Sequence, residues 1–184
     1  GHQQVLILIP SGIEEDGTHV FVGFVGLEGI DPLGGEAAFA IGEPEFTRLT
    51  GRSPMLLAGM TPTTVDAKIV AAATNAGHWA ELAGGGQVTE EIFERRVAEL
   101  SDLLDPGRAV QFNALFLDPY LWKLQVGGKR LVQKARQAGA PIDGLVISAG
   151  IPDLEEAVEL IEELNGVGIA YVCFKPGTVE QIRS

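Results

Sequence analysis

The chain has 184 residues, with 13 lysines and arginines against 25 aspartates and glutamates, and therefore a formal net charge of −12. Its 46% hydrophobic and 21% charged residues are typical of one globular domain, or of a domain with an appendage, and exclude disorder as the main description. The acidic charge argues against nucleic acid and anionic membrane surfaces as partners, because both bind clustered lysine and arginine.

The single cysteine, Cys173, cannot form an internal disulfide or a site with several thiolate ligands. This favours a reducing compartment, and we expect a cytoplasmic protein. No stretch approaches the roughly 18–20 apolar residues that span a bilayer, and the first residues do not follow the pattern of a signal peptide. We therefore expect no membrane partner.

The N-terminal quarter of the chain differs in composition from the rest. The β-rich runs at 5–9 and 19–26 predict two strands joined by a loop. Residues 27–53 are rich in glycine, proline and acidic residues, which indicates a linker or a wrapping segment. We predict a β appendage with a linker over residues 1–46 and a main domain over residues 47–184.

In the main domain, short apolar runs alternate with segments of helical periodicity. The runs predict strands of a parallel sheet covered on both faces, at 54–59, 79–83, 109–115, 144–148 and 169–175. The intervening segments predict helices at 64–75, 89–104, 119–138 with a break at Gly127 and Gly128, and 153–164, with another beginning at residue 179.

This alternation predicts a parallel α/β architecture, which is either an open doubly wound sheet or an eight-stranded barrel. Five units can complete a small open sheet, whereas a barrel typically needs about 250 residues. Periodicity alone therefore favours the open sheet.

The loops that follow the predicted strands contain the most unusual residues. They are Ala58–Thr64, Gly84–Gly86, Ala149–Pro152 and Pro176–Thr178. Parallel α/β proteins bind ligands at this end of the sheet, where helix N-termini present backbone N–H groups. Glycine in any one loop can serve only the tight turn, but four such loops on one rim favour a ligand site. The sequence contains neither a dinucleotide-binding fingerprint nor a phosphate-binding P-loop.

Three polar residues stand within or at the end of apolar strands. Lys175 closes the fifth strand, where it could hold an anionic group or be a solvated strand end. Asn113 needs a hydrogen-bond partner if it is buried, supplied either by a ligand or by the protein. Glu81 must likewise be paired, which makes it a further site candidate.

Histidine and cysteine placement predicts neither a metal site nor a hydrolytic triad. His78 precedes the second strand, away from the loops, and His2 and His19 lie in the N-terminal segment. Cys173 stands inside a strand, where the role of a small buried hydrophobic residue is favoured.

Five ordered blocks between Leu49 and Val179 resemble one protein family. The blocks are LTGRSPMLLAGMTPTT, HWAELAGGG, VQFNALFLDP, APIDGLVISAGIP and CFKPGTVE. They resemble the enoyl reductase domain of type I fatty acid synthases, most closely the bacterial, mycobacterial-type enzymes and also the fungal β subunit. The resemblance implies an FMN-containing (β/α)8 TIM barrel, related to nitronate monooxygenases and to flavin-type enoyl reductases. It therefore predicts the first five units of an eight-unit barrel in place of the open sheet.

The resemblance also implies an activity and partners. It implies that the chain is part of the FMN-dependent enoyl-[acyl-carrier-protein] reductase of a multifunctional synthase in fatty acid biosynthesis. Such an enzyme uses NADPH or NADH to reduce trans-2-enoyl chains carried on acyl carrier protein, with the hydride passing through FMN. The implied partners are acyl carrier protein, the other domains of the synthase and further copies in a homo-oligomeric assembly.

The residues that match the family's flavin-contacting positions are Ala58, Gly59, Met60, Thr61, Asn113, Ser148, Ala149, Gly150 and Lys175. By this resemblance the loop that begins at Ala58 lies against the flavin ring, and Lys175 reaches toward its isoalloxazine and ribityl side. A positive charge there would favour the reduced anionic flavin, and bare backbone would let the ring stack.

Two parts of the family pattern lie outside the sequence. One is the glycine-rich segment ending in a histidine pair that contributes the proton donor, and the other is the pair of loops that hold the FMN phosphate. We therefore expect a fragment that is inactive alone and carries no catalytic residue. An inert structural segment of the synthase shell is the alternative. A nitronate monooxygenase-like enzyme ranks below both, because it lacks the LTGRSPMLLAGMTPTT block.

Overall fold

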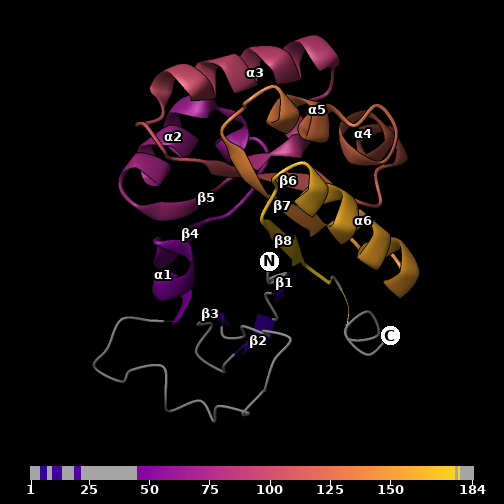
Figure 1. Cartoon of the computed structure of the whole chain (residues 1–184). Helices are drawn as coiled ribbons and strands as arrows, with labels where there is room; N and C mark the ends of the chain where they lie inside the picture. Colours follow the sequence, from indigo (N-terminus) through magenta and orange to yellow (C-terminus); the bar gives the residue numbers. More distant parts are fainter. Residues whose placement is uncertain (1–4, 8–9, 14–18, 22–44, 177, 179–184) are drawn as a thin grey trace.

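A computed structural model describes residues 5–7, 10–13, 19–21, 45–176 and 178. Its main feature is a parallel sheet with the strand order β1-β8-β7-β6-β5-β4 (Figure 1). The strands are Val5–Ile7 (β1), Ser53–Leu57 (β4), His78–Ala83 (β5), Val110–Leu115 (β6), Ile142–Ser148 (β7) and Tyr171–Phe174 (β8). The predicted parallel α/β class is confirmed.

Helices follow the strands of the sheet as predicted, with their ends shifted by a few residues. They are Ala67–Asn75 (α2), Glu90–Leu103 (α3), Pro119–Trp122 (α4), Leu131–Gln137 (α5) and Leu154–Gly166 (α6). Short helical turns lie at Thr63–Val65 (η2) and Gly84–Gly86 (η3), and a π-helical turn, Lys123–Gly127 (η4), follows α4. The helix predicted from residue 179 lies outside the described residues.

Side-chain caps explain where four of these helices begin. A short oxygen-bearing side chain before each helix accepts backbone N–H groups of the first turn, which satisfies donors that have no partner inside the helix. The capping residues are Asp66, Thr89, Asp118 and Asp153. Helix starts are therefore encoded locally in this chain.

The N-terminal segment differs from its predicted organisation in two ways. The runs at 5–9 and 19–26 each contain a strand, but β1 pairs with β8, whereas His19–Phe21 (β3) pairs with Pro10–Ile13 (β2) in a separate antiparallel sheet. In addition, Glu45–Thr50 forms helix α1 within the segment interpreted as a linker. The domain boundary near residue 46 stays a prediction.

The strand order contradicts the open doubly wound sheet that periodicity alone favoured. Strands β4 to β8 are neighbours in chain order, so the sheet has no point at which the winding direction reverses. In a flat sheet, β4 and β8 would be about 19 Å apart, at about 4.8 Å per strand. Arg52, just before β4, nevertheless places its guanidinium carbon 5.5 Å from the ring centre of Tyr171 in β8. The sheet is therefore a curled half-barrel, and its closure by further strands stays a prediction.

Arg52 joins the N-terminal ends of the strands across this curl. Its guanidinium donates hydrogen bonds to the Asp143 carboxylate and to the Ala109 carbonyl, at 3.2 Å from the latter. It also stacks over the Trp79 ring, with 4.9 Å between the guanidinium carbon and the ring centre. One side chain thus contacts residues from four other parts of the sheet.

The two faces of the sheet carry different side chains, because successive residues of a strand point to opposite sides. On the convex face, Leu82, Phe112 and Leu145 belong to one apolar core shared with residues of the helices. The intervening residues Glu81 and Asn113 contact each other on the concave face. The apolar core therefore lies between sheet and helices, and the inside of the curl carries these polar residues beside the buried Val146 and Cys173.

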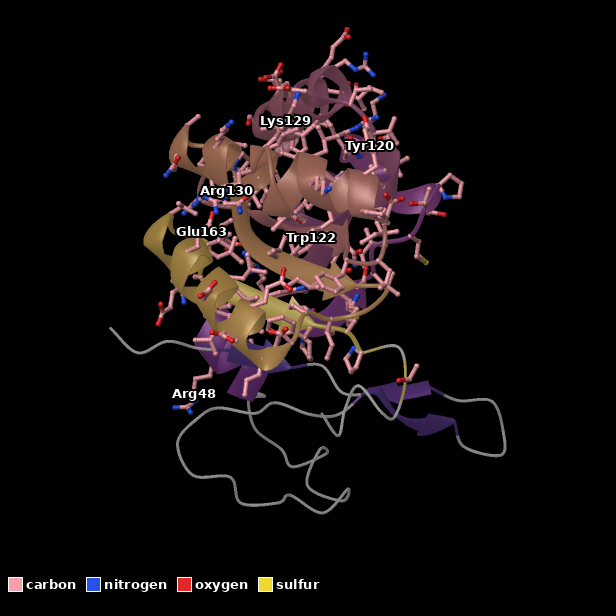
Figure 2. All side chains as sticks on the ribbon, turned by 90° about the vertical axis from the view of Figure 1, so that its right-hand side faces the viewer. Arg48, Tyr120, Trp122, Lys129, Arg130 and Glu163 are labelled. Atoms are coloured by element: carbon pink, nitrogen blue, oxygen red, sulfur yellow. The ribbon has the colours of Figure 1, made fainter. Side chains whose placement is uncertain are left out.

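Ion pairs lie on the surface of the helical side of the molecule (Figure 2). The Lys129 ammonium pairs with Glu90 of α3 at 2.8 Å, and Arg130 pairs with Glu163 of α6 at 3.1 Å. A hydrogen bond and Coulomb attraction within the first pair lower the pKa of Glu90 and raise the pKa of Lys129. Exposed pairs of this kind contribute little to stability, so they provide matched controls for the buried pairs.

Candidate functional site

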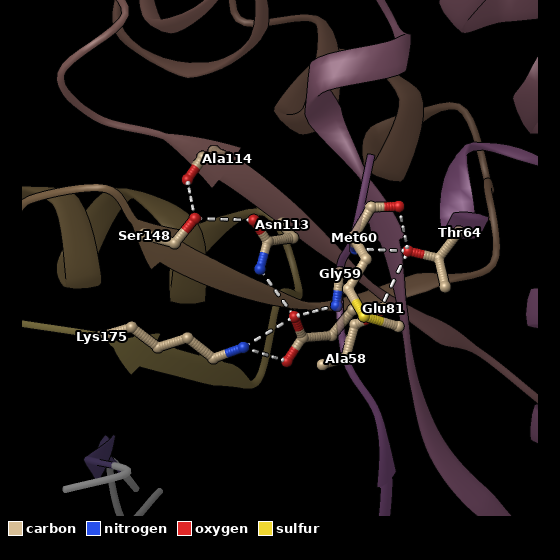
Figure 3. Close-up of polar contacts among 9 residues, drawn as sticks. All are labelled: Ala58, Gly59, Met60, Thr64, Glu81, Asn113, Ala114, Ser148 and Lys175. Carbon is tan, nitrogen blue, oxygen red and sulfur yellow. Dashed lines mark hydrogen bonds and ion pairs between the residues drawn. The ribbon is translucent and has the colours of Figure 1, made fainter. Parts of the chain in front are cut away.

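Glu81 is the centre of a polar cluster at the C-terminal ends of the strands (Figure 3). Its side chain is fully buried, and its carboxylate accepts hydrogen bonds from three directions. The donors are the Asn113 amide at 2.6 Å, the Gly59 backbone N–H at 2.8 Å and the Lys175 ammonium at 2.8 and 2.9 Å. This arrangement satisfies a buried charge with a cation and two neutral donors, the condition under which a carboxylate can be buried.

Asn113 is oriented from both ends of its amide. The Ser148 hydroxyl donates to Asn113 Oδ1 at 2.7 Å, and Asn113 Nδ2 donates to Glu81. The network therefore runs from β7 through β6 to β5. Asn113 is 5% exposed, and an amide buried in an apolar strand needs hydrogen-bond partners. The protein itself supplies them.

Lys175 reaches the cluster from the residue that follows β8. Its backbone N–H donates to the Ile147 carbonyl at 2.8 Å, which extends the pairing with β7. Its side chain then crosses to Glu81 on β5 and remains 27% exposed. An ammonium has three protons. Because Glu81 accepts from it through two oxygens, one proton of this partly exposed ammonium would be available to a ligand.

The loop after β4 is held by Thr64, whose side chain is fully buried. The Met60 backbone N–H donates to Thr64 Oγ1 at 2.7 Å, and the hydroxyl lies 3.2 Å from the carbonyl oxygens of Ala58 and Met60. The N–H groups of Gly59 and Met60 are thus already bonded within the protein. A ligand could therefore stack on this loop, but neither of these N–H groups would donate a hydrogen bond to it.

Gly59 lets this loop approach the sheet closely. A Cβ at this position would lie 2.6 Å from Asn113 Cβ, far inside the distance that two carbon atoms tolerate. Glycine is therefore required here by the packing of backbone against Asn113. The backbone of this loop and the polar cluster consequently lie next to each other.

Thr61 and Gly150 occupy neighbouring loops and make no hydrogen bond to the cluster within the described structure. Thr61 lies against Gly85, where a Cβ would be 2.5 Å from Thr61 Oγ1. Gly150 has a φ of +110° and lies beneath Leu117, and Ala149 before it also has a positive φ, of 54°. Of the residues predicted for the site, the structure brings together Gly59, Asn113, Ser148 and Lys175, with Ala58 and Met60 beside them.

Two residues of the cluster are only partly predictable from the sequence. Glu81 is a candidate because a carboxylate interrupts an apolar strand, and that signal does not identify Lys175 as its partner. Thr64 fits the start of the predicted helix. Nothing in the sequence separates this buried threonine from the exposed Thr61 and Thr63 beside it.

Cys173 is buried in β8 and His78 stands at the start of β5, as predicted, whereas His2 lies outside the described residues. Burial raises the pKa of the Cys173 thiol to about 12, and the charge of Glu81 adds to that effect. The thiol is therefore a poor nucleophile at neutral pH. His78 Nδ1 lies 2.7 Å from the Ser53 hydroxyl at the opposite end of the sheet. Among the described residues, no three His, Cys, Asp or Glu side chains gather as a metal site requires, and no helix could cross a bilayer.

The fold and the cluster define an α/β protein with a buried carboxylate–lysine pair at the strand ends, where parallel sheets bind ligands. Its sequence is similar to the fatty acid synthase subunit beta of Saccharomyces cerevisiae, with 38% identity over 140 residues, or 76% of this chain and 6% of that protein. A fatty acid synthase beta subunit of Monascus ruber is 39% identical over 141 residues, or 77% of this chain and 7% of that protein. Fatty acid synthase 2 of Mycosarcoma maydis is 41% identical over 138 residues, or 75% of this chain and 4% of that protein.

The chain is therefore a homologue of a segment of the fungal fatty acid synthase beta subunits, which confirms the resemblance to that family. It spans less than a tenth of the length of these relatives, at 7% and 6% of the first two. No protein-family model matches the chain.

Proposed function

We propose that this chain forms the first part of an FMN-binding enoyl reductase barrel in a fatty acid synthase. The observation that carries the proposal is the cluster of Lys175, Glu81 and Asn113 beside the partly exposed Gly59. It lies at the strand ends at which parallel barrels bind ligands. Homology to fatty acid synthase beta subunits supports the same conclusion.

The residues of the cluster fit the flat ring of a flavin. A planar ring needs an unobstructed surface and a polar partner at its edge. Ala58 and Gly59 are partly exposed, and Met60 is 47% exposed. Lys175 supplies a cation with one proton outside its pair with Glu81. We therefore assign the ring surface to the loop that begins at Ala58 and the edge contacts to Lys175 and Asn113.

When bound, FMN would supply hydride transfer from a nicotinamide to a carbon–carbon double bond. The residues of this chain would bind the flavin and orient its ring. Lys175 places a positive charge at the ring edge, and the buried pair with Glu81 keeps that charge in position. The proton for the second carbon of the double bond would come from a group outside this sequence, because His78 lies at the opposite end of the sheet.

The proposal extends to substrates and partners. We propose trans-2-enoyl chains on acyl carrier protein as the substrate, with NADPH or NADH as the reductant, in the cytoplasm. Neighbouring domains of the same synthase and further copies of it in an oligomer would be the structural partners. The size of the homologues supports this, because the matched segment is 7% of the Monascus ruber subunit.

A flavin titration of the complete protein that carries this sequence tests the proposal. Quenching of FMN fluorescence should be saturable, and Lys175→Ala and Asn113→Ala should each weaken binding by about tenfold, or about 1.4 kcal/mol. Lys129→Ala is the matched control, because that ammonium pairs with Glu90 on the outer surface. Removal of FMN should abolish enoyl reduction, and added FMN should restore it.

Two results would contradict the proposal. One is the absence of saturable FMN binding by the complete protein. The other is enoyl reduction that continues unchanged after the flavin has been removed. Either result would favour a structural role for this segment in the synthase.

A further inference from the structure

We propose that Glu81 is a positioning residue of this site, whose buried carboxylate sets the direction of the Lys175 ammonium and the Asn113 amide toward a flavin. This inference rests on the proposed function and assigns to Glu81 a role of its own within it. Glu81 itself is 0% exposed and would not touch a ligand, so it acts through the groups that it holds.

Glu81 holds the end of the Lys175 side chain in one place. A lysine side chain is a flexible four-carbon stem that ends in a compact charge. Both Glu81 oxygens accept from Lys175 Nζ, at 2.8 and 2.9 Å, so the ammonium sits between them. Without the carboxylate nothing in this cluster would hold the ammonium at the strand ends, since its other neighbours Asn113 and Gly59 both direct N–H donors at Glu81.

Donors from three parts of the sheet converge on Glu81. Glu81 Oε2 also accepts from the Asn113 amide of β6 and from the Gly59 N–H of the loop after β4. One carboxylate therefore sets the relative position of the cation, the amide and the backbone of the loop at Gly59. Each of these is a group that the proposed function assigns to flavin binding. A buried carboxylate elsewhere in the sheet would not combine the three.

The first experiment measures the pair itself and needs no flavin. The complete protein is acetylated with a trace of acetic anhydride, and peptide mass spectrometry gives the labelling of Lys175 relative to Lys129. An ammonium that donates to both oxygens of a buried carboxylate is shielded from the reagent. Glu81→Gln should therefore raise the labelling of Lys175 several-fold and leave Lys129 unchanged. The matched control Glu90→Gln removes the partner of Lys129 and should raise labelling only there.

The second experiment is a double-mutant cycle on FMN binding. Glu81→Gln should raise the FMN dissociation constant by about tenfold in the otherwise unchanged protein. In a Lys175→Met background the same substitution should have a smaller effect, of about threefold, because only the Asn113 amide then remains for Glu81 to position. A purely structural carboxylate would weaken binding equally in both backgrounds. Glu90→Gln should leave the dissociation constant unchanged.

Glu81→Asp tests the same inference if the Glu81→Gln variant does not fold. It retains the charge and withdraws the carboxylate by one methylene, so FMN binding should weaken several-fold while the thermal unfolding transition stays cooperative. Unchanged labelling of Lys175 in both variants would overturn the inference, and so would equal effects of Glu81→Gln with and without Lys175. Failure of the unsubstituted protein to bind FMN would overturn the proposed function instead, and the labelling would still decide whether Glu81 holds Lys175.

Discussion

Cys173 shows how strongly a single residue is affected by the inside of the curl. It stands in β8 two residues before Lys175, is 1% exposed and carries a thiol. Desolvation is the largest cause of its raised pKa, and the nearby charge of Glu81 raises it further, whereas Lys175 lowers it. The same poorly solvated surroundings make an unpaired Glu81 costly, which is why its carboxylate needs three donors.

The raised pKa of Cys173 predicts a loss of stability at alkaline pH. The folded state holds the thiol proton up to about pH 12, whereas the unfolded chain releases it near the ordinary value of 9.0. The stabilising contribution is therefore complete below that ordinary value and is lost as the pH rises toward 12, by about 1.4 kcal/mol per pH unit.

Denaturant unfolding at pH 8 and pH 10.5 measures this effect. Between the two pH values, the unsubstituted chain should lose about 2 kcal/mol more of its free energy of unfolding than Cys173→Val does. The valine variant is the control, because it fits a buried strand and has no proton to release. Equal losses in the two proteins would show that the thiol is not protected from ionisation.

At the scale of elements, the curl of the sheet depends on contacts between strand ends that are far apart in sequence. At one end Arg52 connects β4 to Asp143 of β7 and stacks beside Tyr171 of β8. At the other end Lys175 connects β8 to Glu81 of β5. In a flat sheet each pair would have to span three strand spacings, or about 14 Å, which is close to the limit of two extended side chains. Long cationic side chains thus hold both ends of the half-barrel.

Arg52→Lys should destabilise the chain by about 2–3 kcal/mol, because lysine cannot reproduce the planar contacts with two rings, a carboxylate and a carbonyl. The side chains of Arg52 and Asp143 are only 10% and 19% exposed, so solvent screens this pair weakly. The matched control is Arg130→Lys, whose pair with Glu163 is 55% and 30% exposed and should change stability by less than about 0.5 kcal/mol. Urea unfolding measures both, and similar values for the two variants would contradict the proposed role of Arg52.

The whole molecule leaves apolar surface at one edge of its sheet. Strand β4 is the last in the strand order and pairs with β5 on one side. Its residues Met55 and Leu56 are 59% and 38% exposed, although inner strands such as β5 are almost entirely buried. An exposed apolar edge strand is a template for pairing with another chain.

The 184-residue chain should therefore self-associate by itself, with an average mass in sedimentation velocity that rises with concentration. Met55→Lys should shift the chain toward the monomer, because a charge on the edge opposes strand pairing. Ile69→Lys is the control, since Ile69 is 40% exposed on helix α2 and its substitution should leave association unchanged. A monomer at every concentration, or equal effects of the two substitutions, would exclude pairing through β4.

The sequence by itself determined the parallel α/β class, the strands from β4 to β8 and the helices after them, because apolar runs and capping residues such as Asp66 and Thr89 act over a few positions. Its motifs also indicated Gly59, Asn113 and Lys175 as site residues. Only the tertiary structure decided the curl of the sheet, the pairing of β1 with β8 and the convergence of three donors on Glu81. These features depend on contacts between residues far apart in the chain, such as Glu81 and Lys175, and no local pattern records which distant residue becomes the partner.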